Sequence, residues 1–312
     1  MQVAGGRYPA QTIKPVAAHT PGARVVIQAA PGAEVRLADP LEVFAPDVTI
    51  SDVTVDGRVR IRESAAGGTL DRTTVMGSVL LDAVGSTVLR SVIVPGVGQD
   101  GIDVRYASEV LLRGNRIGPG SRGSNGTHVD CIQVMGGTGI RIMDNELFRC
   151  ATQQLHIKPD VRPIRGVLVT GNRITGCGKR TPECDGYMAV DVRFASHDIR
   201  DVVLRHNVLD GALYPDDVPG LSVRDNHITW FSRCKAAWAS DNTVVQNGPA
   251  CNGPVSPSAT APGADYSPVE ARSAGARASG SPAAAPDVVS PPVSGLPTNG
   301  RPGLRPILRL QE

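Results

Sequence analysis

The stretch Ile142-Met143-Asp144-Asn145-Glu146-Leu147 decides the fold, because its pattern recurs along the chain. Each copy starts with an aliphatic or small residue, continues with polar or small residues, and ends on an aliphatic residue two places after the fourth position. Nine segments follow the pattern, beginning at Ile50, Leu70, Leu89, Leu112, Ile142, Val169, Leu204, Val223 and Ala239. Self-similarity at periods of about 20–50 residues indicates stacked structural repeats.

The fourth position of the repeat is asparagine in six consecutive copies. The aligned residues are Val53, Thr73, Val92, Asn115, Asn145, Asn172, Asn207, Asn226 and Asn242. Asparagine tolerates the left-handed conformation that a sharp bend needs, and its amide can bond to the coils above and below. We therefore predict an all-β chain, a right-handed parallel β-helix of about nine three-strand coils with an asparagine ladder.

The chain has two segments of different composition. Aromatic residues make up only 4% of the sequence, so Val, Ile, Leu and Ala must fill the core, which suits thin and regular layers. From residue 251 onward Pro, Ala, Ser and Gly dominate, and such a segment cannot bury enough apolar surface to offset its ordering entropy. We predict a β-helix over residues 1–250 and a disordered tail over 251–312.

Charge, apolar runs and cysteines indicate which partners and which cellular compartment to expect. The net charge is +2 without a basic stripe, which argues against nucleic acid, and no apolar run reaches the roughly 18 residues of a membrane span. Because none of the six cysteines forms a CxxC pair, a zinc site is not expected from them. We expect an oxidising compartment, an export signal upstream of this sequence, a monomer, and disulfides joining Cys177 to Cys184, Cys234 to Cys251 and Cys131 to Cys150.

A second strand in each central repeat alternates between inward and outward side chains. The inward residues are aliphatic: Ile102, Val104, Ile132, Val134, Leu155, Ile157, Val190 and Val192. Their neighbours point outward and form a polar face: Asp103, Arg105, Gln133, His156, Lys158, Asp191 and Arg193. Three consecutive repeats here are long, and insertions on a rigid scaffold are where sites usually lie.

Two motifs on this face resemble those of polygalacturonase-type glycoside hydrolases. The segment Gln99–Val104 is similar to the family's Asn-Thr-Asp-Gly coil, and His128–Val134 is similar to its Asp-Asp-Cys coil. The resemblance implies a pectin- or polyuronate-active β-helix enzyme, polygalacturonase-like or pectate-lyase-like. Asp100 and Asp130 match the first and last of the three aspartates, whereas Val129 stands where the family has its general acid. The segment Leu155-His156-Ile157-Lys158 stands loosely in place of the later Arg-Ile-Lys element.

Two chemistries fit these residues. Hydrolysis needs an acid and a base about 6.5–9.5 Å apart for inversion, and lyase chemistry needs a base near a cation. We expect catalysis from Asp100, His128, Asp130, His156 and Lys158. We expect substrate binding by Asp103, Arg105, Gln133, Asp191, Arg193 and Tyr187.

Calcium is the one ion that the paired acids suggest; no residues dedicated to a metal are predicted. The predicted function is a secreted protein that binds and cleaves an extracellular polysaccharide, with a polyuronate as one candidate. A non-catalytic surface or adhesion module is the alternative, and epimerases form a third class.

Overall fold

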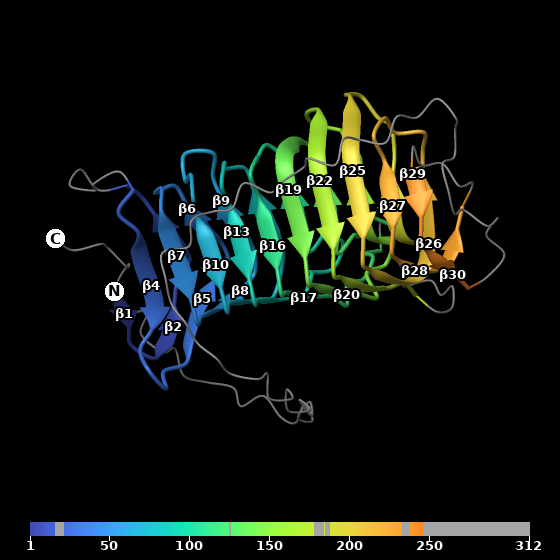
Figure 1. The fold of residues 1–312 in the computed structure, drawn as a ribbon. Helices are drawn as coiled ribbons and strands as arrows, with labels where there is room; N and C mark the ends of the chain where they lie inside the picture. Colours follow the sequence, from blue (N-terminus) through green and yellow to red (C-terminus); the bar gives the residue numbers. More distant parts are fainter. Residues whose placement is uncertain (16–21, 125, 178–183, 185–187, 233–237, 246–312) are drawn as a thin grey trace, which may run out of the picture. The chain divides into compact units, whose positions relative to one another are not determined.

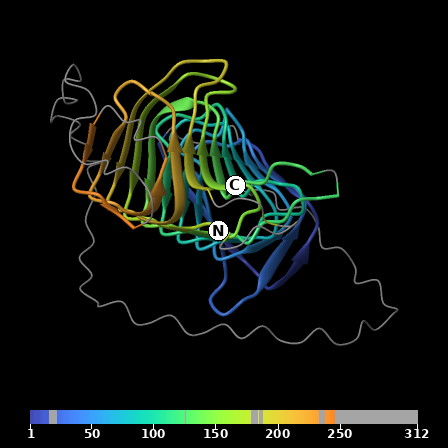
Figure 2. The same cartoon turned by 90° about the vertical axis from the view of Figure 1, so that its right-hand side faces the viewer.

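The computed structural model describes residues 1–15, 22–124, 126–177, 184, 188–232 and 238–245. The chain forms a right-handed parallel β-helix, as predicted. Each coil has three strands in chain order, and we call the three resulting sides faces A, B and C. Figure 1 shows the strands of face A side by side, and Figure 2, turned by 90°, shows the coils one behind another. No helix in the described part of the chain has the length and apolar character needed to cross a bilayer.

Face A is a sheet of eleven parallel strands. Its strands are β1 (Gln2–Val3), β4 (Val25–Ala29), β7 (Val48–Ser51), β10 (Thr69–Asp71), β13 (Thr87–Leu89), β16 (Leu111–Arg113), β19 (Gly137–Met143), β22 (Ile164–Thr170), β25 (Ile199–Arg205), β27 (Ser222–Arg224) and β29 (Trp238–Ser240). Nine of these strands begin the predicted repeats. The remaining two, β1 and β4, precede them and lack the asparagine signature.

Faces B and C run along the other sides of the coil. Face B holds β2 (Gly6–Tyr8), β5 (Val35–Ala38), β8 (Thr54–Asp56), β11 (Thr74–Val75), β14 (Val92–Ile93), β17 (Arg116–Ile117), β20 (Glu146–Phe148), β23 (Arg173–Thr175), β26 (Val208–Pro215), β28 (His227–Phe231) and β30 (Thr243–Val244). Face C holds β3 (Gln11–Ile13), β6 (Leu41–Val43), β9 (Val59–Ile61), β12 (Val79–Leu81), β15 (Ile102–Val104), β18 (Ile132–Val134), β21 (Gln153–Ile157) and β24 (Met188–Val192). The long strands β26 and β28 continue both faces, because β26 pairs with β23 and with β24.

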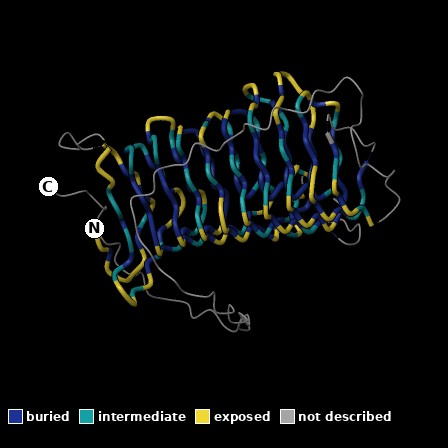
Figure 3. Tube along the Cα trace, viewed as in Figure 1, coloured by how far each residue is buried: buried dark blue, intermediate teal, exposed yellow. Residues whose placement is uncertain are grey.

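The core follows from the strand alternation that the sequence predicted. On face C, Ile102, Ile132 and Leu155 stack in register and are fully buried. Figure 3 shows buried stretches along the strands and exposed segments concentrated at the turns. Burying one such aliphatic side chain contributes about 1.5–3 kcal/mol, so the stacked columns hold the coils in a fixed register.

The asparagine ladder is present at the turn between faces A and B. The backbone N–H of Asn115 donates to Asn145 Oδ1 at 2.9 Å, and Asn145 N–H donates to Asn172 Oδ1 at 2.9 Å. The Asn145 amide also donates to the carbonyl of Leu112 in the preceding coil. The same pattern continues to Asn207, Asn226 and Asn242. The side-chain amides of Asn115 to Asn226 also donate to the next asparagine of the ladder, so each of these five residues joins its coil to both neighbours.

Two details of the predicted ladder are wrong. The left-handed residue of the turn is the one before the asparagine, such as Asp144 with φ 54° or Gly171 with φ 68°. The asparagine makes the hydrogen bonds of the ladder, and the residue before it makes the sharp bend of the backbone. The residue aligned with Asn115 is Ser91 and not Val92, because Val92 pairs with Arg116.

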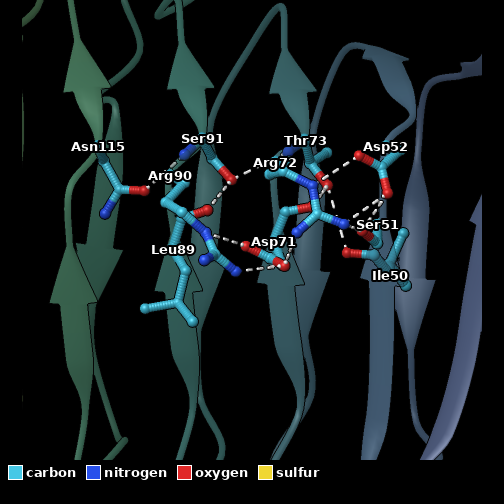
Figure 4. Close-up of polar contacts among 10 residues, drawn as sticks. All are labelled: Ile50, Ser51, Asp52, Asp71, Arg72, Thr73, Leu89, Arg90, Ser91 and Asn115. Carbon is cyan, nitrogen blue, oxygen red and sulfur yellow. Dashed lines mark hydrogen bonds and ion pairs between the residues drawn. The ribbon is translucent and has the colours of Figure 1, made fainter. Parts of the chain in front are cut away.

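Serine and threonine continue the ladder toward the N-terminus. Thr73 N–H donates to Ser91 Oγ at 3.1 Å, and Ser91 N–H donates to Asn115 Oδ1 at 3.0 Å (Figure 4). Beside them, Arg72 pairs with Asp52 at 2.8 Å on the outer surface. The N-terminal coils thus replace the amide by hydroxyls and add exposed ion pairs.

Two of the three predicted disulfides are present. The Cα atoms of Cys131 and Cys150 are 5.4 Å apart, and those of Cys177 and Cys184 are 6.0 Å apart; both fall in the range for a disulfide. The pair Cys234–Cys251 and the predicted domain boundary at residue 250 lie outside the described residues. Such bonds are typical of an oxidising compartment.

Candidate functional site

The register of face C brings four outward residues from four coils into one row. Asp103 of β15 pairs with Gln133 of β18, which pairs with His156 of β21 and then with Asp191 of β24. Neighbouring strands lie about 4.8 Å apart, so residues 88 positions apart in sequence (103 to 191) come within three strand spacings.

Asp130 is the centre of the site and lies in the turn that leads into β18. Its carboxylate has no exposure, and Oδ2 lies 3.0 Å from His128 Nδ1 and 3.2 Å from His156 Nδ1. The other oxygen, Oδ1, accepts the backbone N–H of Gln153 at 2.9 Å. Both carboxylate oxygens therefore have partners that fix the orientation of the group.

The two histidines differ in exposure. The side chain of His128 is 43% exposed, whereas that of His156 is 8% exposed. Their rings lie 5.3 Å apart between centroids. His128 is thus the member of the cluster that a large ligand can reach, and Asp130 and His156 lie behind it.

Asp100 and Asp103 form an acidic group beside this cluster. Asp100 precedes β15, and its Oδ1 accepts the backbone N–H of Asp130 at 2.6 Å. Burial, with the charge of Asp130, raises the pKa of Asp100 to about 6. Burial and the neighbouring Asp100 raise the pKa of Asp103 well above its usual range. These acids are therefore held closer to their protonated form than ordinary aspartates.

The His–Asp contacts shift pKa values in the opposite sense. Burial alone would raise the pKa of Asp130, but hydrogen bonds from His128 and His156 outweigh it and lower the pKa. Burial alone would lower the pKa of His128, but its hydrogen bond to Asp130 and the charges of Asp130 and Asp100 raise it. The cluster therefore favours a charged pair at its centre.

Asp191 and Arg193 extend the site along face C. Asp191 is 1% exposed, and its Oδ1 accepts Arg193 Nε at 2.7 Å. Its Oδ2 lies 3.6 Å from His156 Nε2 and accepts the Gln153 side-chain amide at 3.3 Å. Arg193 is about half exposed, so its cationic end borders the site.

Other predicted residues lie near the row without joining the central contacts. Lys158 pairs with Asp160 at 3.0 Å, and the Arg105 guanidinium lies 5.8 Å from the ring centroid of Tyr106. Gln133 stands between Asp103 and His156 in the register. Tyr187 lies outside the described residues.

Two residues that hold the site together carried no signal in the sequence. Gln153 supplies a backbone donor to Asp130 and a side-chain donor to Asp191. Thr152 accepts the Val129 N–H at 2.8 Å and lies 3.3 Å from Arg122 Nη2 in the preceding long loop. Both residues precede the regular alternation of β21, so the period-two pattern gave no signal for them.

The donor set of the cluster is also that of a metal site. His128, Asp130 and His156 each offer one ligand atom, and these atoms all lie within 4.8 Å of one another. Two nitrogens and one oxygen suit a transition ion such as zinc better than calcium, which takes six to eight oxygens. The calcium expectation based on Asp100 and Asp130 concerns a different pair of residues and stays a prediction.

Comparison with known proteins supports the fold. No protein-family model and no curated protein matches the chain. The structure is similar to the crystal structure of the Dettilon tailspike protein, with a TM-score of 0.50 and 11% sequence identity. The match covers 74% of this chain and 47% of the tailspike chain, about half of its length. This chain is thus an all-β protein of the parallel β-helix class.

Proposed function

We propose that face C between β15 and β24 binds and cleaves an extracellular polysaccharide that contains uronate residues. The observation that carries the proposal is the contact of exposed His128 with the buried carboxylate of Asp130, which also contacts His156. An imidazole oriented by a carboxylate is a common arrangement for proton transfer. Here the arrangement opens toward solvent on a row of polar side chains.

The burial of Asp130 favours one of the two chemistries considered. Inverting hydrolysis needs two carboxyl groups that both reach the glycosidic bond. Asp130 has no exposure and both its oxygens are already hydrogen-bonded. We therefore assign Asp130 and His156 positioning roles. In its unprotonated form, which the raised pKa of His128 shifts to higher pH, His128 is the base that removes a proton next to a uronate carboxyl group. This is the chemistry of a polysaccharide lyase.

Two arginines near the cluster fit the charge of such a substrate. Arg193 is held by Asp191, whose other oxygen lies near His156, and Arg122 contacts Thr152 and acts on the pKa of His128. Abstraction of a proton next to a carboxylate builds negative charge that a guanidinium can stabilise. Asp100 and Asp103 are the acids placed to return a proton to the leaving oxygen.

An aromatic pair continues the row beyond Asp191. Tyr214 follows Asp191 in the register, and its ring lies 4.9 Å from that of Trp230 in an edge-on arrangement. Both side chains are partly exposed. Aromatic rings combine an apolar face with a polar edge, which matches a sugar ring and supports a glycan as the ligand.

The disulfides support an extracellular location, so we propose that the protein is secreted. We also propose that it acts as a monomer. A non-catalytic surface module is the competing function, since a polar face of this kind can bind a glycan without cleaving it.

A panel of polyuronates and neutral polysaccharides tests the proposal. Products are followed both by reducing ends and by the absorbance of unsaturated sugars. The expected result is unsaturated product from at least one polyuronate, and His128→Ala should lower its rate by about 100-fold or more. His227→Ala, an exposed histidine on face B, is the matched control and should leave the rate unchanged.

Each other outcome has a separate meaning. Reducing ends without unsaturated product would indicate a hydrolase. Glycan binding without turnover would support the non-catalytic module. A rate that is unchanged in His128→Ala would contradict the assigned base.

A further inference from the structure

The central cluster brings three potential metal-ligand atoms together. His128 Nδ1 and His156 Nδ1 converge on one oxygen, Asp130 Oδ2, at 3.0 and 3.2 Å, which are hydrogen-bond distances. Two donors bound to a metal at about 2.0–2.2 Å lie roughly 2.9–3.5 Å apart at octahedral or tetrahedral angles, so the two His–Asp distances also suit a bound ion. All three ligand atoms lie within 4.8 Å of one another.

The surroundings of the two ring nitrogens of His156 are a second observation that favours a bound cation. Both ring nitrogens face acids, because Nδ1 lies against Asp130 and Nε2 lies 3.6 Å from Asp191 Oδ2. Nε2 is buried and has no hydrogen-bond partner in the structure. A neutral imidazole carries only one N–H, so a proton on Nδ1 would leave a lone pair on Nε2 facing a carboxylate.

A cation bound at Nδ1 removes this conflict. The single N–H of His156 would then sit on Nε2 and point at Asp191. Metal-bound histidines usually donate their second N–H to a carboxylate, and metal-bound carboxylates are themselves hydrogen-bonded. Asp191 is fixed by Arg193 at 2.7 Å, and Asp130 Oδ1 accepts the Gln153 N–H at 2.9 Å. Both supporting contacts are in place.

We propose that His128 Nδ1, Asp130 Oδ2 and His156 Nδ1 form a binding site for one divalent transition-metal ion of the zinc class. Three protein ligands leave at least one further coordination position, and His128, one of the three, is 43% exposed. A water molecule or a carboxylate oxygen of a glycan could occupy such a position. The sequence predicted no dedicated metal ligands, because His128, Asp130 and His156 come together only in the folded coil.

The inference uses the residues of the proposed function but does not depend on turnover. His128 can act as the base only in the metal-free protein. With the ion bound it is a ligand, and the ion would hold the uronate carboxylate. The two accounts therefore separate experimentally.

Calorimetric titration of the full chain with Zn²⁺ tests the site directly. The protein is prepared without a histidine tag and stripped with a chelator, and Co²⁺ provides a parallel visible spectrum. One equivalent of Zn²⁺ should bind per chain, and Ca²⁺ at the same concentration should not compete. His128→Ala should weaken binding by about 100-fold, and Asp191→Asn by about 10–100-fold. His227→Ala should leave binding unchanged.

His128 is on the surface, so its replacement is expected to leave the fold intact, and circular dichroism of each variant checks this. Absence of Zn²⁺ binding, or equal binding by wild type and His128→Ala, would overturn the metal site. So would imidazole nitrogen shifts showing His156 protonated on both nitrogens in the presence of Zn²⁺. Metal binding without glycan turnover would leave the site standing and reject the proposed function. Turnover that survives the chelator would reject a metal role and keep His128 as the base.

Discussion

Face C carries buried acids in two regions, the coils of β9 and β12 and the coils of β18 and β21. In the first region Asp82 is 4% exposed and pairs with Arg60 at 2.7 Å. In the second region Asp130 has no exposure and meets two histidines. The strands are parallel and in register in both regions.

The backbone is alike in the two regions, so the chemistry that each buried aspartate can support depends on the side chains that contact it. Arginine stays charged at all relevant pH values, so Arg60 forms an ion pair with the Asp82 carboxylate but cannot itself exchange a proton near neutral pH. Histidine can gain or lose a proton or ligate a metal. The cluster around Asp130 therefore contains groups suited to proton transfer or metal binding, whereas the partner of Asp82 is not such a group.

The disulfide beside Asp130 gives the largest predicted effect on stability. Replacing Cys131 and Cys150 by alanine opens a loop with a sequence separation of 19, which should lower stability by about 3 kcal/mol. Because Cys131 follows Asp130 directly, glycan binding should weaken as well. Urea unfolding followed by circular dichroism measures the first effect, and an unchanged midpoint would contradict it.

The ladder allows a comparison of amide and hydroxyl rungs. Asn145→Leu removes the amide bonds to Asn115 and Leu112 in the preceding coil and to Asn172 in the following coil, and should destabilise by about 1–3 kcal/mol. Thr73→Val removes one hydroxyl from an N-terminal rung and should cost about 0.5–1.5 kcal/mol. Unfolding midpoints of the two variants test the order. Equal losses would mean that the amide adds nothing beyond the hydroxyl.

Loss of an exposed ion pair in the N-terminal coils should have the smallest effect. Arg62 pairs with Glu42 at 2.6 Å, and both side chains are partly exposed. Arg62→Gln should change stability by less than about 1 kcal/mol and leave glycan turnover unchanged. Thermal unfolding of wild type and variant at low and high salt measures the effect. Because salt screens exposed charges, a large loss of stability in the variant at high salt would contradict the prediction.

Periodicity predicted the fold because it reports on burial. The inward residues of β15, β18 and β21 alternate strictly, so their direction follows from the sequence alone. The asparagine of each turn was found for the same reason, since its position repeats. The left-handed residue was misplaced by one position, because Asp144, Gly171 and His206 share no residue type.

Candidate site residues could be picked from the sequence only where a pattern marked them. The strand alternation marked His156 and Asp191, and the motif His128–Val134 marked His128 and Asp130. Gln153 was missed because its role depends on a backbone N–H, which any residue supplies. The partner of Lys158 was also missed, since Asp160 lies beyond the end of the strand and outside the period.

The most direct test compares the two buried acids of face C. Asp130→Asn and Asp82→Asn make the same chemical change at two buried carboxylates that lie next to strands of face C, and turnover of the best polyuronate is measured for both. We expect Asp130→Asn to lower kcat by about 100-fold or more, with circular dichroism showing that the variant is folded, and Asp82→Asn to keep wild-type turnover. Equal turnover in the two variants would contradict the assignment of the site to the cluster around Asp130.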